Sequence, residues 1–279
     1  MTNKQHTELF NTDLAWDKLY NKLKEENLLV PEKKPVFFLH KAMKIAAIFV
    51  ALISLSMVVF FYFFSNTGRQ VFVENNLQSA IKEVQLPDGS VIHLNKGAKI
   101  WYPKEFAENT REITFEGEAF FEITKMNGKP FVVKTQKAEI KVLGTSFNVN
   151  TLINNKLEVL VATGKVQVSE IENKQNAVLL TAGQMASVQN SRILKHQNTN
   201  KNYLSWKTKQ FNFENVEMQQ VVEDLNRAYN VHIVLNNESI LTRKLRTHFD
   251  NKPLETILKV IAEPYNLKIK QTENEIILE

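Results

Sequence analysis

The run HKAMKIAAIFVALISLSMVVFFYFFSNTG, residues 40–68, determines how the whole chain is organised. Between Ile45 and Phe64 it holds no charged residue, no glycine and no proline. A helix of about 20 residues is about 30 Å long, which matches the hydrocarbon core of a bilayer. A helix in a protein core would normally carry a polar stripe, and here only two serines and a tyrosine hydroxyl interrupt the apolar surface. We therefore expect residues 45–64 to form one transmembrane helix.

The position of this run argues against a cleaved signal peptide. Signal peptides begin within the first residues and end in small side chains, whereas 44 residues precede this run and phenylalanines end it. Four lysines, at positions 33, 34, 41 and 44, closely precede the run, and only Arg69 closely follows it. Because the lysine-rich flank of a span stays in the cytoplasm, we expect residues 1–44 to be cytoplasmic. The residues after the span would face the periplasm of a double-membraned bacterium. We therefore expect a single-pass protein of the inner membrane, anchored in its lipid.

Composition excludes several classes of function. The net charge of +5 is small and dispersed, so the chain lacks the basic cluster that direct nucleic-acid binding requires. The absence of cysteine excludes disulfides, thiol nucleophiles and thiolate metal sites. The six histidines show no metal-ligand spacing, and the sequence has no phosphate-binding glycine loop or nucleophile elbow. We expect no cofactor, no metal and no enzymatic activity.

The cytoplasmic segment contains an amphipathic helix, TDLAWDKLYNKLKEEN, residues 12–27. Leu19, Tyr20 and Leu23 follow Trp16 at spacings of three, four and seven, which places all four on one helical face. So short a segment cannot bury these side chains by itself. The face could lie in a groove of a partner protein or on the lipid surface.

Residues 84–190 are predicted to form an all-β domain, with linkers at 65–83 and 191–208. Short runs of alternating apolar residues are separated by turn sequences such as LPDGS, residues 86–90. A roll, a sandwich and a short solenoid all fit this pattern.

The strand ITFEGEAFFEI, residues 113–123, has an apolar face and a second face that we expect to point away from the apolar side. That second face holds Thr114, Glu116, Glu118, Phe120 and Glu122. Two carboxylates at this spacing are compatible with the acid and base of a glycosidase. Solvent-exposed glutamates on a strand are the simpler interpretation.

Residues 209–279 are predicted to form a small α+β domain with two similar halves. Residues 213–234 align without gaps on 249–270 at an offset of 36. Each half shows a helical stripe followed by Tyr-Asn and an alternating strand, so each is predicted to be helix then strand. Pro253 suits the first turn of the second helix.

Five ordered motifs after the apolar run closely resemble the FecR-type anti-sigma factors. They are VQLPDGSVIHLNKGAKIWYP, ITFEGEAFFEI, KPFVVKT, VLGTSFNV and LEVLVATGKVQV. The resemblance is greatest to the branch common in Bacteroidota, whose C-terminal domain resembles the short signalling domain of secretins and TonB-dependent receptors. It implies structural roles for the motif residues Leu86, Pro87, Asp88, Gly89, Gly117, Glu118, Phe121, Gly144, Thr145, Phe147, Asn148 and Gly164.

The resemblance also implies a signal transducer that crosses the membrane once. Its cytoplasmic segment would bind an extracytoplasmic-function sigma factor, here through Trp16, Leu19, Tyr20 and Leu23. Its periplasmic part would sense the signalling domain of an outer-membrane TonB-dependent receptor. Two alternatives remain at this point: a membrane-tethered periplasmic protein that binds or hydrolyses carbohydrate, and a component of envelope assembly.

Overall fold

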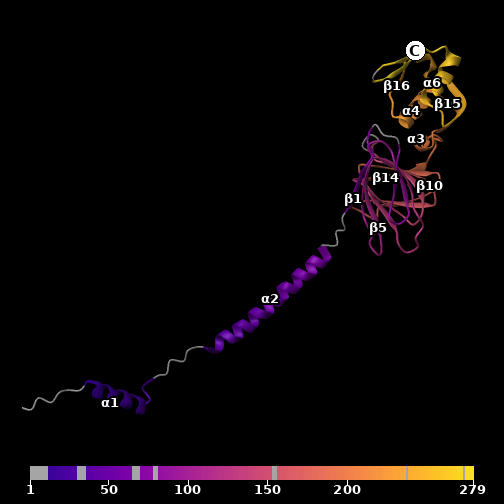
Figure 1. Cartoon of the computed structure of the whole chain (residues 1–279). Coiled ribbons are helices and arrows are strands. Elements are labelled where there is room, and N and C mark those ends of the chain that lie inside the picture. The colour runs from indigo at the N-terminus through magenta and orange to yellow at the C-terminus, as the bar shows by residue number, and fades with distance from the viewer. Residues whose placement is uncertain are drawn as a thin grey trace, which may run out of the picture. The chain divides into compact units, whose positions relative to one another are not determined.

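The computed structural model describes residues 12–29, 36–64, 70–77, 81–152, 156–236, 238–272 and 274–279. The chain divides into two compact units, Met1–Asn66 and Thr67–Glu279 (Figure 1).

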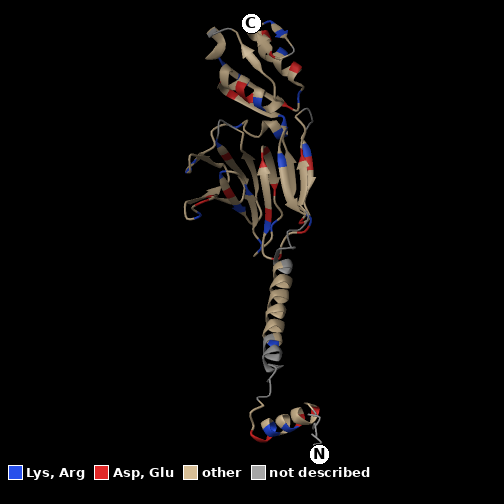
Figure 2. Cartoon of the chain, turned by 90° about the vertical axis from the view of Figure 1, so that its left-hand side faces the viewer, with Lys and Arg blue, Asp and Glu red and all other residues tan. Residues whose placement is uncertain are grey.

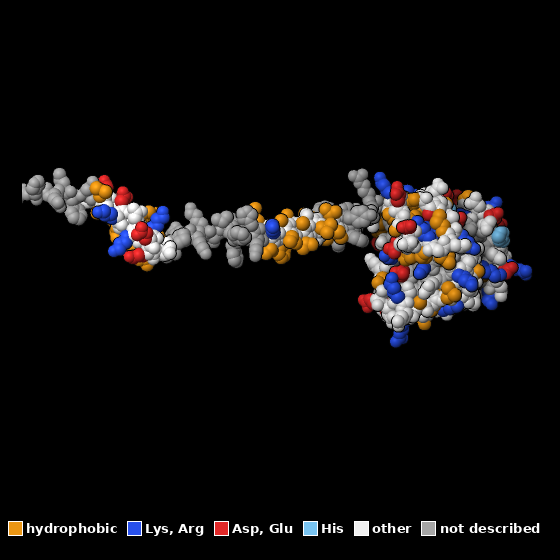
Figure 3. All heavy atoms as spheres, turned by 90° about the horizontal axis from the view of Figure 1, so that it is seen from below, with side chains coloured by type: hydrophobic (Ala, Val, Ile, Leu, Met, Phe, Trp, Pro, Cys, Tyr) orange, Lys and Arg blue, Asp and Glu red, His pale blue; other side chains and the backbone are white. Residues whose placement is uncertain are grey.

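The described residues of the first unit form two helices, α1 (Thr12–Glu25) and α2 (Val36–Phe64). Within α2, residues Met43–Phe60 have a mean hydropathy of 2.4 and are long and apolar enough to cross a membrane. Hydrophobic side chains cover this stretch and lie open to the surroundings (Figure 3). The hydroxyls of Ser54 and Ser56 donate hydrogen bonds to carbonyls one turn earlier, at 2.9 and 2.8 Å, so these two hydroxyls are satisfied within the helix.

The second unit begins with two seven-stranded sheets. Sheet A contains, in spatial order, β1 (Gln70–Glu74), β4 (Lys99–Pro103), β5 (Arg111–Glu116), β7 (Phe131–Lys134), β8 (Ala138–Val142), β11 (Lys165–Glu170) and β12 (Ala177–Thr181). Sheet B contains β14 (Arg192–Gln197), β13 (Gln184–Gln189), β10 (Leu157–Thr163), β9 (Ser146–Asn150), β6 (Glu118–Glu122), β3 (Val91–Leu94) and β2 (Lys82–Gln85). Among these strands, β5 and β7 pair in parallel and the other pairs are antiparallel.

The two sheets pack face to face around one apolar core, which makes this domain a β-sandwich. Phe115 of sheet A meets Phe121 of sheet B edge to face at 5.2 Å between ring centroids, and Phe121 stacks on Phe147 at 4.9 Å. Alternation along each strand supplies this core, since every second residue of β5 is buried. Of the three architectures that the strand pattern allowed, the structure adopts the sandwich.

The sandwich extends beyond the expected limits of 84–190 at both ends. Strand β1 lies within the stretch 65–83, and β14 lies within 191–208, both of which the sequence analysis assigned to linkers. Each is an edge strand, and β14 has mostly exposed residues. The apolar alternation is therefore weak in β14, and this explains why its sequence pattern did not reveal a strand.

The C-terminal domain contains two copies of a strand–helix–strand unit. The first copy is β15 (Gln210–Glu217), α4 (Met218–Tyr229) and β16 (Ile233–Leu235), followed by α5 (Glu238–Leu241). The second is β17 (Lys244–Asp250), α6 (Leu254–Ala262) with the 3-10 turn η1 (Glu263–Tyr265), and β18 (Ile269–Gln271). A final strand, β19 (Ile276–Leu278), follows. The opening strand of each copy is the part that the sequence analysis missed.

The two copies assemble through their strands. β15 pairs antiparallel with β17, and β19 lies between β16 and β18 in a three-stranded sheet. Helices α4 and α6 bury their apolar stripes in a shared core. One detail differs from expectation: Pro253 lies just before α6 with an extended ψ of 145°, so it precedes the first helical turn that it was expected to occupy.

Candidate functional site

The apolar face of α1 is uncovered. None of the residues of α1 is buried, and Trp16 and Tyr20 are 68% and 57% exposed. Leu19 is exposed and Leu23 is half-buried. Charged side chains of both signs occur on the rest of α1, whereas α2 shows no acidic side chain among those coloured in Figure 2. Soluble proteins seldom leave such a cluster of large apolar side chains open unless another surface covers it.

A second candidate site is the joint between the sandwich and the C-terminal domain. The outer face of sheet B, which the sequence analysis expected to face solvent, is partly covered by α4 and by the segment that leads into the C-terminal domain, residues 198–208, here called the connector. The connector includes the short helix α3 (Ser205–Thr208), which is labelled between the two domains in Figure 1. Glu118 and Phe120 are therefore buried, at 4% and 7% exposure, and the expectation that both were exposed is wrong.

Glu118 is the polar centre of this joint. Its carboxylate accepts hydrogen bonds from the side-chain amides of Asn95 at 2.9 Å and Asn148 at 3.1 Å. It also forms an ion pair with Arg227, which α4 carries near its C-terminal end. The Arg227 guanidinium donates to the Tyr203 carbonyl at 2.5 Å and lies 3.8 Å from the centre of the Tyr203 ring. One arginine thus holds the connector and the sandwich together.

Three further side chains of the connector contact sheet B. The Trp206 indole N–H donates to the Asn148 side-chain carbonyl at 3.1 Å, and Trp206 is 1% exposed. The Tyr203 hydroxyl donates to Glu158 at 3.0 Å, and burial raises the pKa of this phenol well above its ordinary value. Lys207 pairs with Glu122 at 2.5 Å. The hydrogen bond from Lys207 is the main reason that the pKa of Glu122 is lowered.

This geometry contradicts the pairing of Glu116 and Glu118 as acid and base. Gly117, with φ +112°, carries the chain from sheet A to sheet B, so the two glutamates belong to different sheets. Glu116 is exposed, whereas Glu118 is buried and paired with Arg227. A general acid needs a protonated carboxyl at the scissile bond. An ion-paired carboxylate beneath another domain cannot take that role.

The structure distributes the family-motif residues over four places. Leu86, Phe121 and Phe147 lie in the sandwich core, and Glu118 and Asn148 lie in the joint. Gly117 is the corner between sheets. The remainder belong to turns at one end of the sandwich: Pro87, Asp88, Gly89, Gly144, Thr145 and Gly164.

Arg111 ties several of these turns together, and the sequence analysis did not identify it. It is fully buried and forms an ion pair with Asp88 at 2.7 Å. It also donates to the carbonyls of Thr124 at 2.9 Å, Lys129 at 3.2 Å and Leu143 at 3.4 Å. A lone arginine at the start of a strand gives no pattern by which sequence alone could reveal this role.

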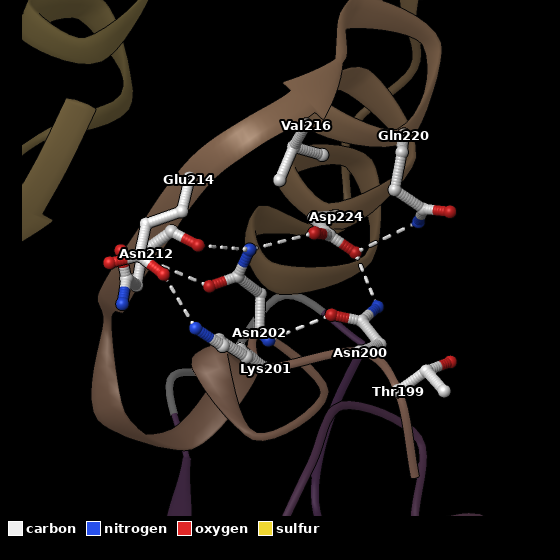
Figure 4. Close-up of a pocket in the computed structure, with 9 residues that line it drawn as sticks. All are labelled: Thr199, Asn200, Lys201, Asn202, Asn212, Glu214, Val216, Gln220 and Asp224. Atoms are coloured by element: carbon white, nitrogen blue, oxygen red, sulfur yellow. Dashed lines mark hydrogen bonds and ion pairs between the residues drawn. The ribbon is translucent and has the colours of Figure 1, made fainter. Parts of the chain in front are cut away.

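A polar pocket of about 230 Å³ lies between the connector, β15 and α4 (Figure 4). Its wall centres on Asp224, whose oxygens accept hydrogen bonds from Asn200 at 2.7 Å, Asn202 at 3.0 Å and Gln220 at 3.1 Å. Because three amides already satisfy this carboxylate, the cluster serves to fix the connector. Within the described residues, no group of three or more acidic or histidine side chains could hold a metal ion.

Comparison with known proteins identifies the family. The model of the FecR protein family matches residues 76–167, and the model of the FecR C-terminal domain matches residues 210–278. Two crystal structures of a protein from Parabacteroides distasonis, assigned as an anti-sigma factor, are each 34% identical to this chain with a TM-score of 0.57. Each match covers 75% of this chain and 98% of the other. Among curated proteins, none matches. The chain therefore belongs to the FecR family of anti-sigma factors.

Proposed function

We propose that this protein is a single-pass inner-membrane anti-sigma factor whose helix α1 binds an extracytoplasmic-function sigma factor in the cytoplasm. The uncovered apolar face of α1 is the observation that carries this proposal. An amphipathic helix of this kind is suited to a hydrophobic groove on a partner, where Trp and Tyr act as anchors. Membership of an anti-sigma factor family supports a sigma factor as that partner.

The orientation of the chain in the membrane is part of the proposal. Helix α2 is the span, and the lysines at 33, 34, 41 and 44 keep the preceding segment in the cytoplasm. The second unit then lies in the periplasm. A reporter fused after Glu279 is expected to be active only when it is an enzyme that works outside the cytoplasm.

We propose further that the periplasmic unit receives its signal from the signalling domain of a TonB-dependent outer-membrane receptor. Strand β18 is an edge strand whose three residues are all exposed. An extended segment of a partner could add to such an edge through main-chain hydrogen bonds. A pull-down of the second unit with the receptor's signalling domain tests this step, and the corresponding secretin fragment tests the envelope-assembly alternative.

The sigma-factor step is tested by co-purifying the full-length chain, in detergent, with the sigma factor encoded beside its gene. Trp16→Ala and Leu23→Ala should each weaken binding by roughly 1–4 kcal/mol, since each removes an apolar anchor. Leu14→Ala is the matched control, because Leu14 is also exposed but lies two positions before Trp16 and so faces another side of the helix. Failure of the unaltered chain to retain the sigma factor would contradict the proposal.

A further inference from the structure

The connector between the sandwich and the C-terminal domain is an ordered element. The side-chain oxygen of Asn198 accepts from the backbone N–H of Asn200, and that of Asn200 accepts from the backbone N–H of Asn202. The side-chain oxygen of Asn202 accepts from the backbone N–H of Asn212 on β15. This ladder joins the connector to the C-terminal domain by local hydrogen bonds. The connector therefore moves with the C-terminal domain.

The contact of this assembly with sheet B combines an apolar centre with charged and polar pairs around it. The apolar side chains that meet there include Phe120, Leu160 and Trp206, and around them lie the pairs of Glu118 with Arg227 and Glu122 with Lys207. Interfaces of this composition between domains commonly permit relative motion. Because apolar contacts are not directional, the exact position of the C-terminal domain on sheet B depends on these specific pairs.

Arg227 is the group with the geometry to do so. It belongs to α4 of the C-terminal domain, and it bonds both to the connector, at the Tyr203 carbonyl, and to the sandwich, at Glu118. If the C-terminal domain covered Glu118 in a position where Arg227 could not reach it, a buried carboxylate would be left without its counter-charge. Such an arrangement is strongly unfavourable. When the C-terminal domain leaves sheet B altogether, Glu118 returns to water. The Glu118–Arg227 pair therefore disfavours other positions of the C-terminal domain that still cover Glu118.

We propose that Arg227 is the pin that holds the C-terminal domain in a single position on sheet B, and that without it the connector, residues 198–208, and the C-terminal domain together move relative to the sandwich. With the pin in place, the two domains move as one body. A displacement imposed on the C-terminal domain is then carried to the sandwich without loss at the joint. This inference does not depend on sigma-factor binding.

Distance measurements on the full-length chain in detergent test the proposal. The chain has no cysteine, so Gln167→Cys on β11 and Val260→Cys on α6, both at exposed positions, give one labelled pair with no background. Electron spin resonance should give one narrow distance distribution for the unaltered joint. Arg227→Gln should broaden it at least twofold. Glu118→Gln leaves the charge on Arg227, which is partly exposed and keeps its hydrogen bond to the Tyr203 carbonyl. This variant should broaden the distribution as well and keeps the test available if the first variant does not fold.

Trypsin provides an independent readout, because Lys201 and Lys207 lie in the connector. Cleavage there should be at least tenfold faster in Arg227→Gln than in the unaltered chain. Lys259→Gln is the matched control, since Lys259 carries the same charge in an exposed pair with Glu255 on α6, away from the joint. A broad distribution in the unaltered chain, or folded variants as narrow and as protease-resistant as the control, would overturn the proposal.

Discussion

At the scale of single residues, the sandwich depends on a buried arginine. Arg111 brings a full positive charge into the protein interior, where Asp88 and three carbonyl oxygens satisfy it. These acceptors belong to three connections, β2–β3, β6–β7 and β8–β9, so one side chain fixes the relative positions of all three. Burial of an ion pair adds little net stability in itself, but breaking one partner of such a pair is costly.

We predict that Arg111→Gln lowers the free energy of unfolding of the second unit by about 3–5 kcal/mol, because Asp88 keeps its charge without a counter-ion. Urea denaturation of the variant measures this loss. Lys134→Gln is the control, since Lys134 pairs with Glu112 at an exposed site and such pairs contribute about 0–1 kcal/mol. If Arg111→Gln lowers the free energy of unfolding by no more than Lys134→Gln does, the role assigned to Arg111 is contradicted.

The sequence predicted the face on which each side chain lies better than what covers that face. Alternation along residues 113–123 correctly separates Phe115 and Phe121, which lie in the core, from Glu116 and Glu122, which are exposed. The same alternation gave no sign that Glu118 would be buried. Its cover comes from Arg227, more than a hundred residues later, and no local pattern reports so distant a contact.

At the scale of elements, the corner between β5 and β6 decides the path of the chain. Gly117 has φ +112°, a conformation that side chains other than glycine rarely adopt. A Cβ at this position would lie 2.5 Å from the backbone of Ala98. Glycine is therefore required both for the angle and for the close approach of the neighbouring turn.

We predict that Gly117→Ala destabilises the second unit by about 2–4 kcal/mol, which combines backbone strain with the clash against Ala98. Gly128→Ala is the comparison, since Gly128 also has a positive φ but no atom within 4 Å of its added methyl group. That variant should cost only about 1 kcal/mol. Thermal unfolding of both variants, followed by circular dichroism, measures the difference, and similar losses would contradict the role assigned to the Ala98 contact.

Local patterns predicted the helices well and the connector poorly. The stripes of α1, α4 and α6 follow the helical period over several turns, and the structure contains helices there. The sequence of the connector predicts a polar linker, because asparagine is common in turns and loops. Their order comes from hydrogen bonds to one another and to Asp224, which depend on geometry that composition does not encode.

At the scale of the whole second unit, the joint should respond to acid. The pKa of Glu122 is lowered from its ordinary value of 4.5, chiefly by the hydrogen bond from Lys207. A lowered folded-state pKa means that the contribution of Glu122 to stability is fully present above that ordinary value and is lost as the pH falls through the folded pKa. Because Glu122 is 44% exposed, solvent screening keeps this contribution small.

We predict that Glu122→Gln makes the second unit less stable at neutral pH and that the difference from the unaltered protein narrows on acidification below 4.5. Urea denaturation at a series of pH values measures this difference. Glu170→Gln, at a site away from the joint where the carboxylate accepts a hydrogen bond from the Asn176 amide, corrects for general effects of removing a carboxylate. A difference that stays constant with pH would mean that the charge of Glu122 contributes nothing.

The position of β19 has a consequence for biosynthesis. This strand follows β16 and β18 in the sequence, yet it lies between them, and Leu278 within it is completely buried. The ribosome must therefore have translated β19 before its two neighbours can be joined in a sheet. The sandwich meets no such delay, since its strands are all made earlier. Nascent chains should thus present a finished sandwich beside an incomplete C-terminal domain, a window in which a chaperone could bind the exposed stripes of α4 and α6.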